Sequence, residues 1–163
     1  MFLSNLHKQA MIKAENALSG RAQPIQVTNC HLITQQPIQP PFAENLQQAI
    51  FAMGCFWGAE KKLWNLPGVV STAVGYMGGT ASDPTYPLVC TGTTGHSEIV
   101  LVAYDPSQTS IYDLLKCFWE NHDPTQGNRQ GNDIGTQYRS AVYWTTADQE
   151  KWVTKSRNAY NDV

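Results

Sequence analysis

Residues 49–60, AIFAMGCFWGAE, change their hydrophobic periodicity in the middle, from the pattern of a strand to that of a helix. Residues 50–53 form a short apolar run that is typical of a buried strand ending at a glycine. From Phe56 the apolar residues recur at helical spacing, and the Pro67-Gly68 pair ends the pattern. Cys55 therefore lies at a strand-to-helix junction, where unpaired N–H groups and the helix dipole favour a thiolate. Position alone leaves two alternatives, a reactive cysteine or a buried structural one.

The composition limits the classes of protein to which the chain can belong. Its 163 residues fit one domain with a sizeable core, and the net charge of −2 lacks the basic footprint of nucleic-acid or acidic-membrane binding. No apolar run approaches the roughly 20 residues of a membrane span, and residues 1–16 lack the pattern of a signal peptide. We therefore expect a cytoplasmic monomer.

The four cysteines, at positions 30, 55, 90 and 117, are widely separated and contain no C-x-x-C pair. This spacing indicates a reduced intracellular protein and not a disulfide framework. Cys30-His31 is the one candidate metal-binding pair, but a metal site needs further ligands close by, so we expect no metal. Cys117 lies beside Asp113 and Glu120, and we expect these acids to disfavour its thiolate.

The pattern from residue 50 onward predicts the order β-α-β-β-α-β-α. The predicted strands are residues 50–53, 69–76, 97–104 and 140–144, and the predicted helices begin near residues 56, 111 and 146. Ser110, with Asp113 three residues later, predicts a helix cap. This order opens with the split βαβ pattern of a ferredoxin-like fold. In such a sheet we expect the first and third strands to run parallel.

Two segments flank or interrupt this pattern. Residues 1–48 predict an extended arm, with a short helix over 11–18 and a Gln- and Pro-rich stretch over 35–48. Residues 49–163 then form the folded domain. Residues 81–95 lack regular periodicity, and residues 121–137 form a polar, glycine-containing loop whose length indicates a functional role.

Glu98 interrupts the clearest strand, residues 97–104, on a face that otherwise carries Val100, Val102 and Tyr104. Burial of a carboxyl group favours its neutral form and raises its pKa. A neutral carboxylic acid can donate a hydrogen bond, which an ionised one cannot. The alternative is an ion-paired carboxylate at the end of the strand, facing solvent.

Several motifs in unbroken order give a specific resemblance over residues 49–145. They are GCFWGAE (54–60), GY (75–76) with GG (78–79), PTY (84–86), TGHSE (94–98), FWENHDP (118–124) and QGNDIGTQYRS (130–140). Together they resemble the A-type peptide methionine sulfoxide reductases. The resemblance implies a two-layer α/β (α+β) fold, with a ferredoxin-like βαββαβ core and family-specific elaborations, and residues 49–163 as the catalytic domain.

The resemblance also implies roles for seven residues. Cys55 is the expected nucleophile and Glu98 the expected acid; Tyr86 and Tyr138 are further hydrogen-bond donors, Asp133 a positioning group, and Phe56 with Trp57 the wall for the S-methyl group. Taken singly, the tyrosines read as turn or surface residues and Asp133 as a turn residue. The proximity of Cys55 and Glu98 is taken from the resemblance and not from the predicted topology.

The implied reaction is thiol-dependent reduction of the S epimer of methionine sulfoxide, free or in oxidised proteins, through a Cys55 sulfenic acid. The implied reductant is thioredoxin, and no cofactor is expected. In the family the resolving cysteines lie in a C-terminal tail that has no counterpart in residues 1–163, and Cys30, Cys90 and Cys117 do not match their positions.

Two other functions are compatible with parts of the pattern. The first is a cysteine hydrolase, in which His96 or His122 activates Cys55 and Asn132 or Asp133 orients the histidine. The second is a non-catalytic module that binds methionine-containing peptides through the aromatic residues. Neither alternative accounts for Glu98 and Tyr138 together.

Overall fold

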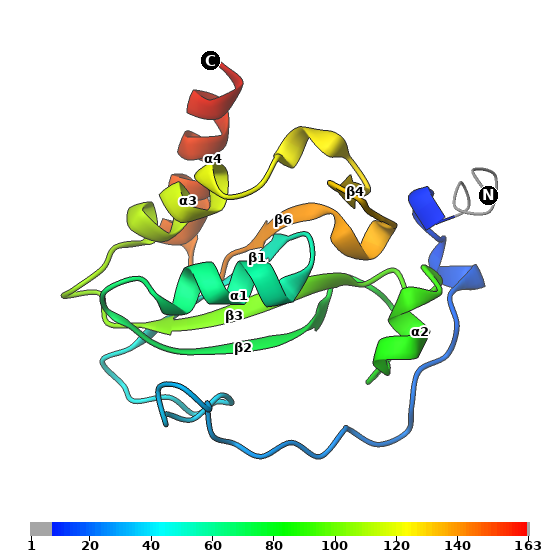
Figure 1. Cartoon of the computed structure of the whole chain (residues 1–163), viewed down its shortest axis with the longest axis horizontal. Helices are drawn as coiled ribbons and strands as arrows, with labels where there is room; N and C mark the ends of the chain where they lie inside the picture. The colour runs from blue at the N-terminus through cyan, green and yellow to red at the C-terminus, as the bar shows by residue number, and fades with distance from the viewer. Residues whose placement is uncertain (1–7, 163) are drawn as a thin grey trace.

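A four-stranded antiparallel sheet with helices packed on one face forms the centre of the molecule (Figure 1). The computed structural model describes residues 8–162, so the first seven residues of the expected arm and Val163 lie outside it. The strands are β1 (Gln47–Met53), β2 (Val69–Met77), β3 (Ser97–Tyr104) and β6 (Ser140–Tyr143), in the order β2-β3-β1-β6. Helix α1 (Phe56–Trp64) connects β1 to β2, helix α3 (Ile111–Glu120) lies between β3 and β6 in the chain, and α4 (Ala147–Asn161) packs on α3. The two-layer ferredoxin-like βαββαβ fold expected from the sequence is confirmed.

The direction of one strand pair differs from our expectation. β1 and β3 pair antiparallel, with Phe51 opposite Val100. The expectation of a parallel pair was wrong because α1 makes β1 and β2 parallel, whereas the β2–β3 connection reverses the chain and inserts β3 between them. The end of β1 therefore lies beside the start of β3, so the topology itself brings Cys55 close to Glu98.

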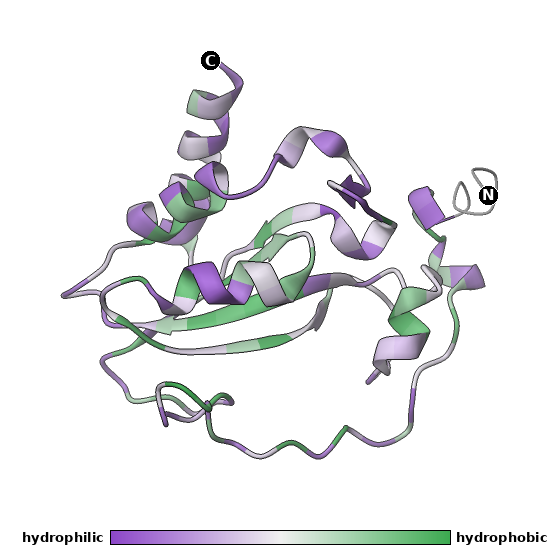
Figure 2. Cartoon of the chain, in the orientation of Figure 1, coloured by the Kyte–Doolittle hydropathy of each residue, from purple (hydrophilic) through white to green (hydrophobic). Residues whose placement is uncertain are grey.

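The core lies between the sheet and the helices, where Figure 2 shows hydrophobic ribbon along β3. Its members are the inward-facing side chains of β1 and β3 and the apolar stripes of α1 and α3, among them Phe51, Val100, Val102, Leu63, Leu114 and Phe118. The spacing of apolar residues along α3 thus matches the side that is buried, whereas β3 is buried on both faces.

Some elements were absent from the predicted pattern or shorter than predicted. Residues 81–95 contain a five-residue helix, α2 (Tyr86–Cys90), capped by the Thr85 side chain, and five residues are too few to show helical periodicity. The polar loop holds a two-stranded hairpin of β4 (Arg129–Gln130) and β5 (Asp133–Ile134) and two 3₁₀ turns. Of the helix expected over 11–18, only a 3₁₀ turn at Ala14–Asn16 is present, since a short helix without a buried face is marginal.

Among residues 8–162, no helix combines the length and the apolar character needed to cross a membrane.

Ser110 and Asp113 form the predicted capping box at the start of α3. The Ser110 Oγ accepts a hydrogen bond from the Asp113 amide at 3.3 Å, and the Asp113 carboxylate accepts one from the Ser110 amide at 2.9 Å. Ser110→Ala removes the first of these bonds. We expect it to lower the free energy of unfolding by about 1 kcal/mol, measured by urea denaturation. Lys151→Ala, on the exposed side of α4, is the control and should leave the midpoint unchanged; equal midpoints for the two variants would contradict the role of the cap.

Candidate functional site

Cys55 is the N-cap residue of α1 and is half-buried. The turn that positions it depends on Gly54, whose φ of +88° is in the left-handed region. A Cβ at Gly54 would also lie 2.7 Å from the side chain of Gln130 on β4. Glycine therefore allows both the sharp exit from β1 and the close approach of the polar loop to the candidate nucleophile.

Glu98, at the start of β3, is the most deeply buried titratable group of the site. Its side chain is 2 % exposed, and Oε2 accepts a hydrogen bond of 2.9 Å from the Phe56 amide, the residue directly after Cys55. Burial raises the pKa of the Glu98 carboxyl; the bond from Phe56 opposes this rise, and the nearby negative charge of Asp133 adds to it. Within residues 8–162 Glu98 has no ion-pair partner, so the solvent-facing ion pair is excluded.

Tyr138 and Tyr86 reach the same region from two different loops. Tyr138 ends the 3₁₀ turn Thr136–Tyr138; burial, followed by the charges of Glu98 and Asp133, raises the pKa of its phenol. Tyr86 is the first residue of α2 and is 53 % exposed. A hydrogen bond with Cys90 is the largest cause that raises the pKa of Tyr86, with smaller contributions from the charges of Glu98 and Cys55. Both phenols therefore stay protonated at neutral pH and can donate hydrogen bonds.

The two aromatic residues after Cys55 differ in exposure. Phe56 is 7 % exposed and belongs to the core, whereas Trp57 is 76 % exposed. Asp133, on β5, is also exposed to solvent. The site is thus built from a buried part, Phe56 with Glu98, and an open part, Trp57 with Asp133.

Tyr76 and Cys90 were not assigned to the site from the sequence. Tyr76 on β2 lies opposite Glu98 in the β2–β3 register, and its ring packs on Phe56 with 5.8 Å between ring centroids. Burial, followed by the charge of Glu98, raises the pKa of Tyr76 to about 12. Cys90, at the end of α2, affects the pKa of Tyr76, Tyr86 and Tyr138. Knowledge of which β2 residue lies opposite Glu98 would have identified Tyr76, but this pairing cannot be derived from the local periodicity of the sequence.

The histidines of the hydrolase alternative are engaged elsewhere. One ring nitrogen of His96 accepts from the Gly79 amide and the other donates to the Ala81 carbonyl. His122 bonds the Phe118 carbonyl through Nδ1 and the Ser140 hydroxyl through Nε2. Neither ring has a free nitrogen for Cys55, and this arrangement argues against a cysteine–histidine hydrolase.

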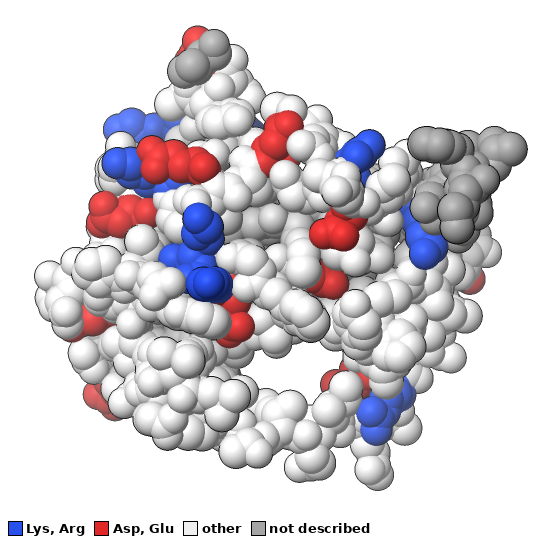
Figure 3. Space-filling model, in the orientation of Figure 1, with Lys and Arg blue, Asp and Glu red and all other residues white. Residues whose placement is uncertain are grey.

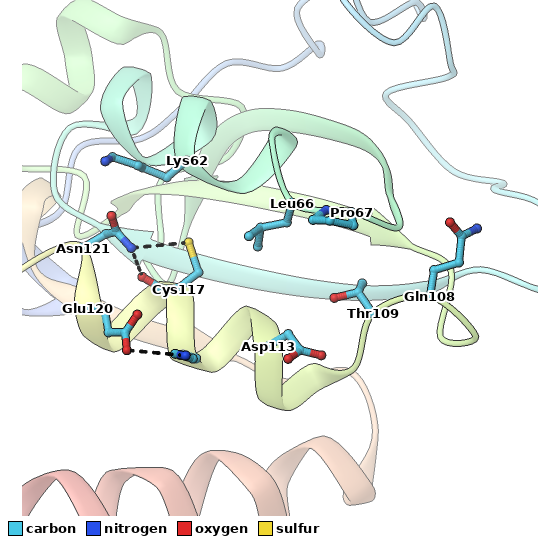
Figure 4. Close-up of a pocket in the computed structure, with 10 residues that line it drawn as sticks. Lys62, Leu66, Pro67, Gln108, Thr109, Asp113, Cys117, Glu120 and Asn121 are labelled. Carbon is cyan, nitrogen blue, oxygen red and sulfur yellow. Dashed lines mark hydrogen bonds and ion pairs between the residues drawn. The ribbon is translucent and has the colours of Figure 1, made fainter.

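Cys117 lies in a separate cleft between the end of α1 and α3, with a volume of about 560 Å³ (Figure 4). Asn121 donates a hydrogen bond to its sulfur at 3.7 Å. Burial is the main cause that raises the pKa of the Cys117 thiol; the charge of Glu120 adds to the rise and that of Lys62 opposes it. The expected rise in the pKa of Cys117 is confirmed, but burial and not the nearby acids is its main cause. Asp113, one of the two acids expected to act on Cys117, instead caps α3.

In the range 8–162, no three His, Cys, Asp or Glu side chains gather as a metal would require. His31 of the candidate pair bonds Thr72 and two backbone amides of its own loop. On the face shown in Figure 3, acidic and basic side chains are interspersed.

The chain is similar to known proteins over most of its length. Residues 47–163 match the model of the family described as peptide methionine sulfoxide reductase. The chain is 57 % identical over 153 residues to peptide methionine sulfoxide reductase MsrA of Rhodospirillum centenum, covering 94 % of this chain and 70 % of the relative. It is 53 % identical over 163 residues to the MsrA of Salinispora arenicola, covering 100 % and 74 %.

A solved structure shows the same fold. Methionine sulfoxide reductase A of Corynebacterium diphtheriae superposes with a TM-score of 0.84 at 40 % sequence identity, over 94 % of this chain and 71 % of that one. The chain therefore belongs to the peptide methionine sulfoxide reductase family, and it is an enzyme of the A type that reduces methionine sulfoxide.

Proposed function

We propose that Cys55 reduces the S epimer of methionine sulfoxide, free or in oxidised proteins, and is itself converted to a sulfenic acid. The observation that carries this proposal is the hydrogen bond between Glu98 Oε2 and the Phe56 amide, because it fixes a buried carboxyl group beside the residue that follows Cys55. The choice of epimer rests on the resemblance to the A type alone, and assays with the two separated epimers test it.

The proposed reaction transfers one oxygen atom between two sulfur atoms. The Cys55 thiolate attacks the sulfoxide sulfur, a proton is delivered to the sulfoxide oxygen, and this oxygen ends on Cys55 as methionine leaves. The substrate sulfur gains two electrons and the cysteine sulfur loses two. The four cysteines of the chain are free in the structure, which is the form that this step requires of Cys55.

Glu98 is the proposed proton donor. Its buried position favours the neutral carboxyl, which can both donate a hydrogen bond to the sulfoxide oxygen and deliver a proton. Tyr86 and Tyr138 are the proposed further donors to this oxygen, and Asp133 is the proposed group that positions water or the substrate backbone. Trp57 and Phe56 are the proposed apolar wall for the S-methyl group.

The return of the sulfenic acid to a thiol requires an external reductant. A thiol attacks the sulfenic sulfur with loss of water, and a second thiol then releases the mixed disulfide. We propose thioredoxin as the source of these thiols, and repair of oxidised proteins in the cytoplasm as the role of the enzyme.

Cys55→Ser tests the nucleophile. We expect no methionine from the S sulfoxide with dithiothreitol as reductant, because a serine alkoxide is inaccessible at neutral pH and serine forms no sulfenic acid. Cys30→Ser, in the arm, is the matched control and should keep the wild-type rate. A Cys55→Ser variant as fast as the control would remove Cys55 from the mechanism.

The oxidised product should be trapped on Cys55 alone. After one turnover without reductant, a β-diketone probe should label Cys55, and the intact mass should show one added oxygen without the probe. Cys30→Ser, which changes a thiol in the arm, should give the same yield of labelled enzyme. A disulfide between Cys55 and Cys90 or Cys117 in the peptide map would contradict a sulfenic acid as the end point of the first step.

The role of Glu98 should appear in the pH profile. Because the pKa of Glu98 is raised in the folded enzyme, kcat/KM should fall as the pH rises through this pKa. Glu98→Gln should keep part of the activity, and its kcat/KM should not show this fall. Glu98→Ala should lose about 10²- to 10⁴-fold in the single-turnover rate.

Stability gives a second readout of the same titration. The raised folded pKa contributes stability that is fully present below the unfolded value of about 4.3 and is lost as the pH rises through the folded value. Glu98→Gln should abolish this decrease in the free energy of unfolding. A wild-type and a Glu98→Gln enzyme with the same pH profiles would exclude Glu98 as the acid.

A further inference from the structure

The N-terminal arm holds both ends of the loop that carries Tyr86. The Leu18 amide donates to the Thr93 carbonyl at 3.1 Å, and the Arg21 amide donates to the Ser82 carbonyl at 2.7 Å. Ser82 precedes α2 and Thr93 follows it. The backbone of the arm therefore joins the two ends of the α2 excursion, with Tyr86 between them.

Gly20 lies at the closest approach of the arm to this loop. A Cβ at this position would come within 1.5 Å of the Ser82 carbonyl oxygen, well below any permitted contact. The φ of Gly20 is outside the left-handed region, so the need for glycine here is one of space and not of backbone conformation. Any side chain at residue 20 must separate the arm from Ser82.

The same part of the arm also contacts the second loop of the site. The Asn128 side chain donates to the Gln9 carbonyl at 2.7 Å, and the Asn128 carbonyl accepts from the Gly135 amide at 3.0 Å. Asn128 and Gly135 belong to the loop that carries Asp133 and Tyr138. Residues 9–21 thus connect the two loops from which the candidate tyrosines project.

Further along, the arm is fastened to the domain by His31. Its Nδ1 accepts from the amides of Ile33 and Thr34, so Nε2 carries the proton and donates to the Thr72 hydroxyl at 2.9 Å. Thr72 in turn donates to the Glu60 carboxylate on α1 at 2.9 Å. His31 is buried, and this anchor ties the arm to β2 and α1.

We propose that the segment of residues 9–21 positions Tyr86 for catalysis, with Leu18, Gly20 and Arg21 acting through Thr93 and Ser82. The inference rests on the proposed role of Tyr86 as a donor to the sulfoxide oxygen. The position of Tyr86 depends on contacts from outside α2, because this helix has only five residues, too few to be stable alone. The Tyr86 side chain is also half exposed, so the core holds it only in part. From the core side the loop is held by the bond of His96 to the Ala81 carbonyl and by that of the Thr80 amide to Thr94.

Gly20→Val tests the contact in the chain of residues 1–163, with Ser19→Ala as the matched neighbour control. We expect kcat/KM for methionine sulfoxide to fall about ten- to a hundredfold in Gly20→Val, because a small misplacement of a reacting group has this effect. Hydrogen–deuterium exchange at the Leu18 and Arg21 amides should accelerate, which reports release of the arm. Alkylation of Cys55 by iodoacetamide should keep its wild-type rate, because the β1–α1 junction has no bond to this segment.

A second variant removes a hydrogen-bond donor without adding a side chain at residue 20. Arg21→Pro lacks the amide that donates to Ser82, and Ala22→Pro is its control, because it places the proline one residue beyond the bond. Arg21→Pro should reproduce the loss in kcat/KM, and Ala22→Pro should not. Unchanged kcat/KM in both Gly20→Val and Arg21→Pro, or a parallel loss of Cys55 alkylation in both, would overturn the proposal.

A double-mutant cycle with Tyr86→Phe separates positioning from general disruption. If the arm acts through the Tyr86 hydroxyl, Gly20→Val should cost much less in the Tyr86→Phe background than in the wild type, whereas independent effects multiply. Multiplicative losses would overturn the inference. If Tyr86→Phe alone equals the wild type, the proposed role of Tyr86 is wrong and the inference that rests on it is overturned as well.

Discussion

The hydrogen bond from the Phe56 amide to Glu98 Oε2 is the interaction on which the site depends. It joins the first turn of α1 to the first residues of β3, and so links the residue after Cys55 to a carboxyl group that is otherwise enclosed. Burial favours the neutral form of Glu98 and the amide favours the ionised form, with burial the stronger of the two. A carboxyl group held in this balance keeps its proton to a higher pH than an exposed one and is still oriented by the backbone.

That bond is possible because of the antiparallel pairing of β1 and β3. The two strands are neighbours in the centre of the sheet, and their opposite directions place the end of one beside the start of the other. Gly54 then turns the chain sharply enough for α1 to begin at once. The proposed nucleophile and the proposed acid thus lie beside the ends of two paired strands in the centre of the sheet.

The proposed hydrogen-bond donors are held in place by loops and not by the sheet. Tyr86 and Tyr138 lie on short helical turns within loops, at the boundary between the buried and the open part of the site. Loops can open to admit a protein substrate, but they hold a side chain less accurately than a sheet does. The arm contacts these same loops through Ser82, Thr93 and Asn128, and so adds hydrogen bonds to the less rigid part of the site.

The sequence was enough to predict the main elements: the strand before Cys55, the helix after it, the strand that carries Glu98 and the cap at Ser110. These are local properties, because strand alternation, helical spacing and capping involve residues close together in the chain. The motifs of the resemblance also identified the candidate residues. Only the tertiary structure decided the direction of β3 beside β1, the position of Tyr76 opposite Glu98, the engagement of His96 and His122, and the attachment of the arm. Each of these involves contacts between segments distant in the sequence. A one-residue change of register or a reversed strand would leave the local sequence pattern the same, so that pattern cannot predict such contacts.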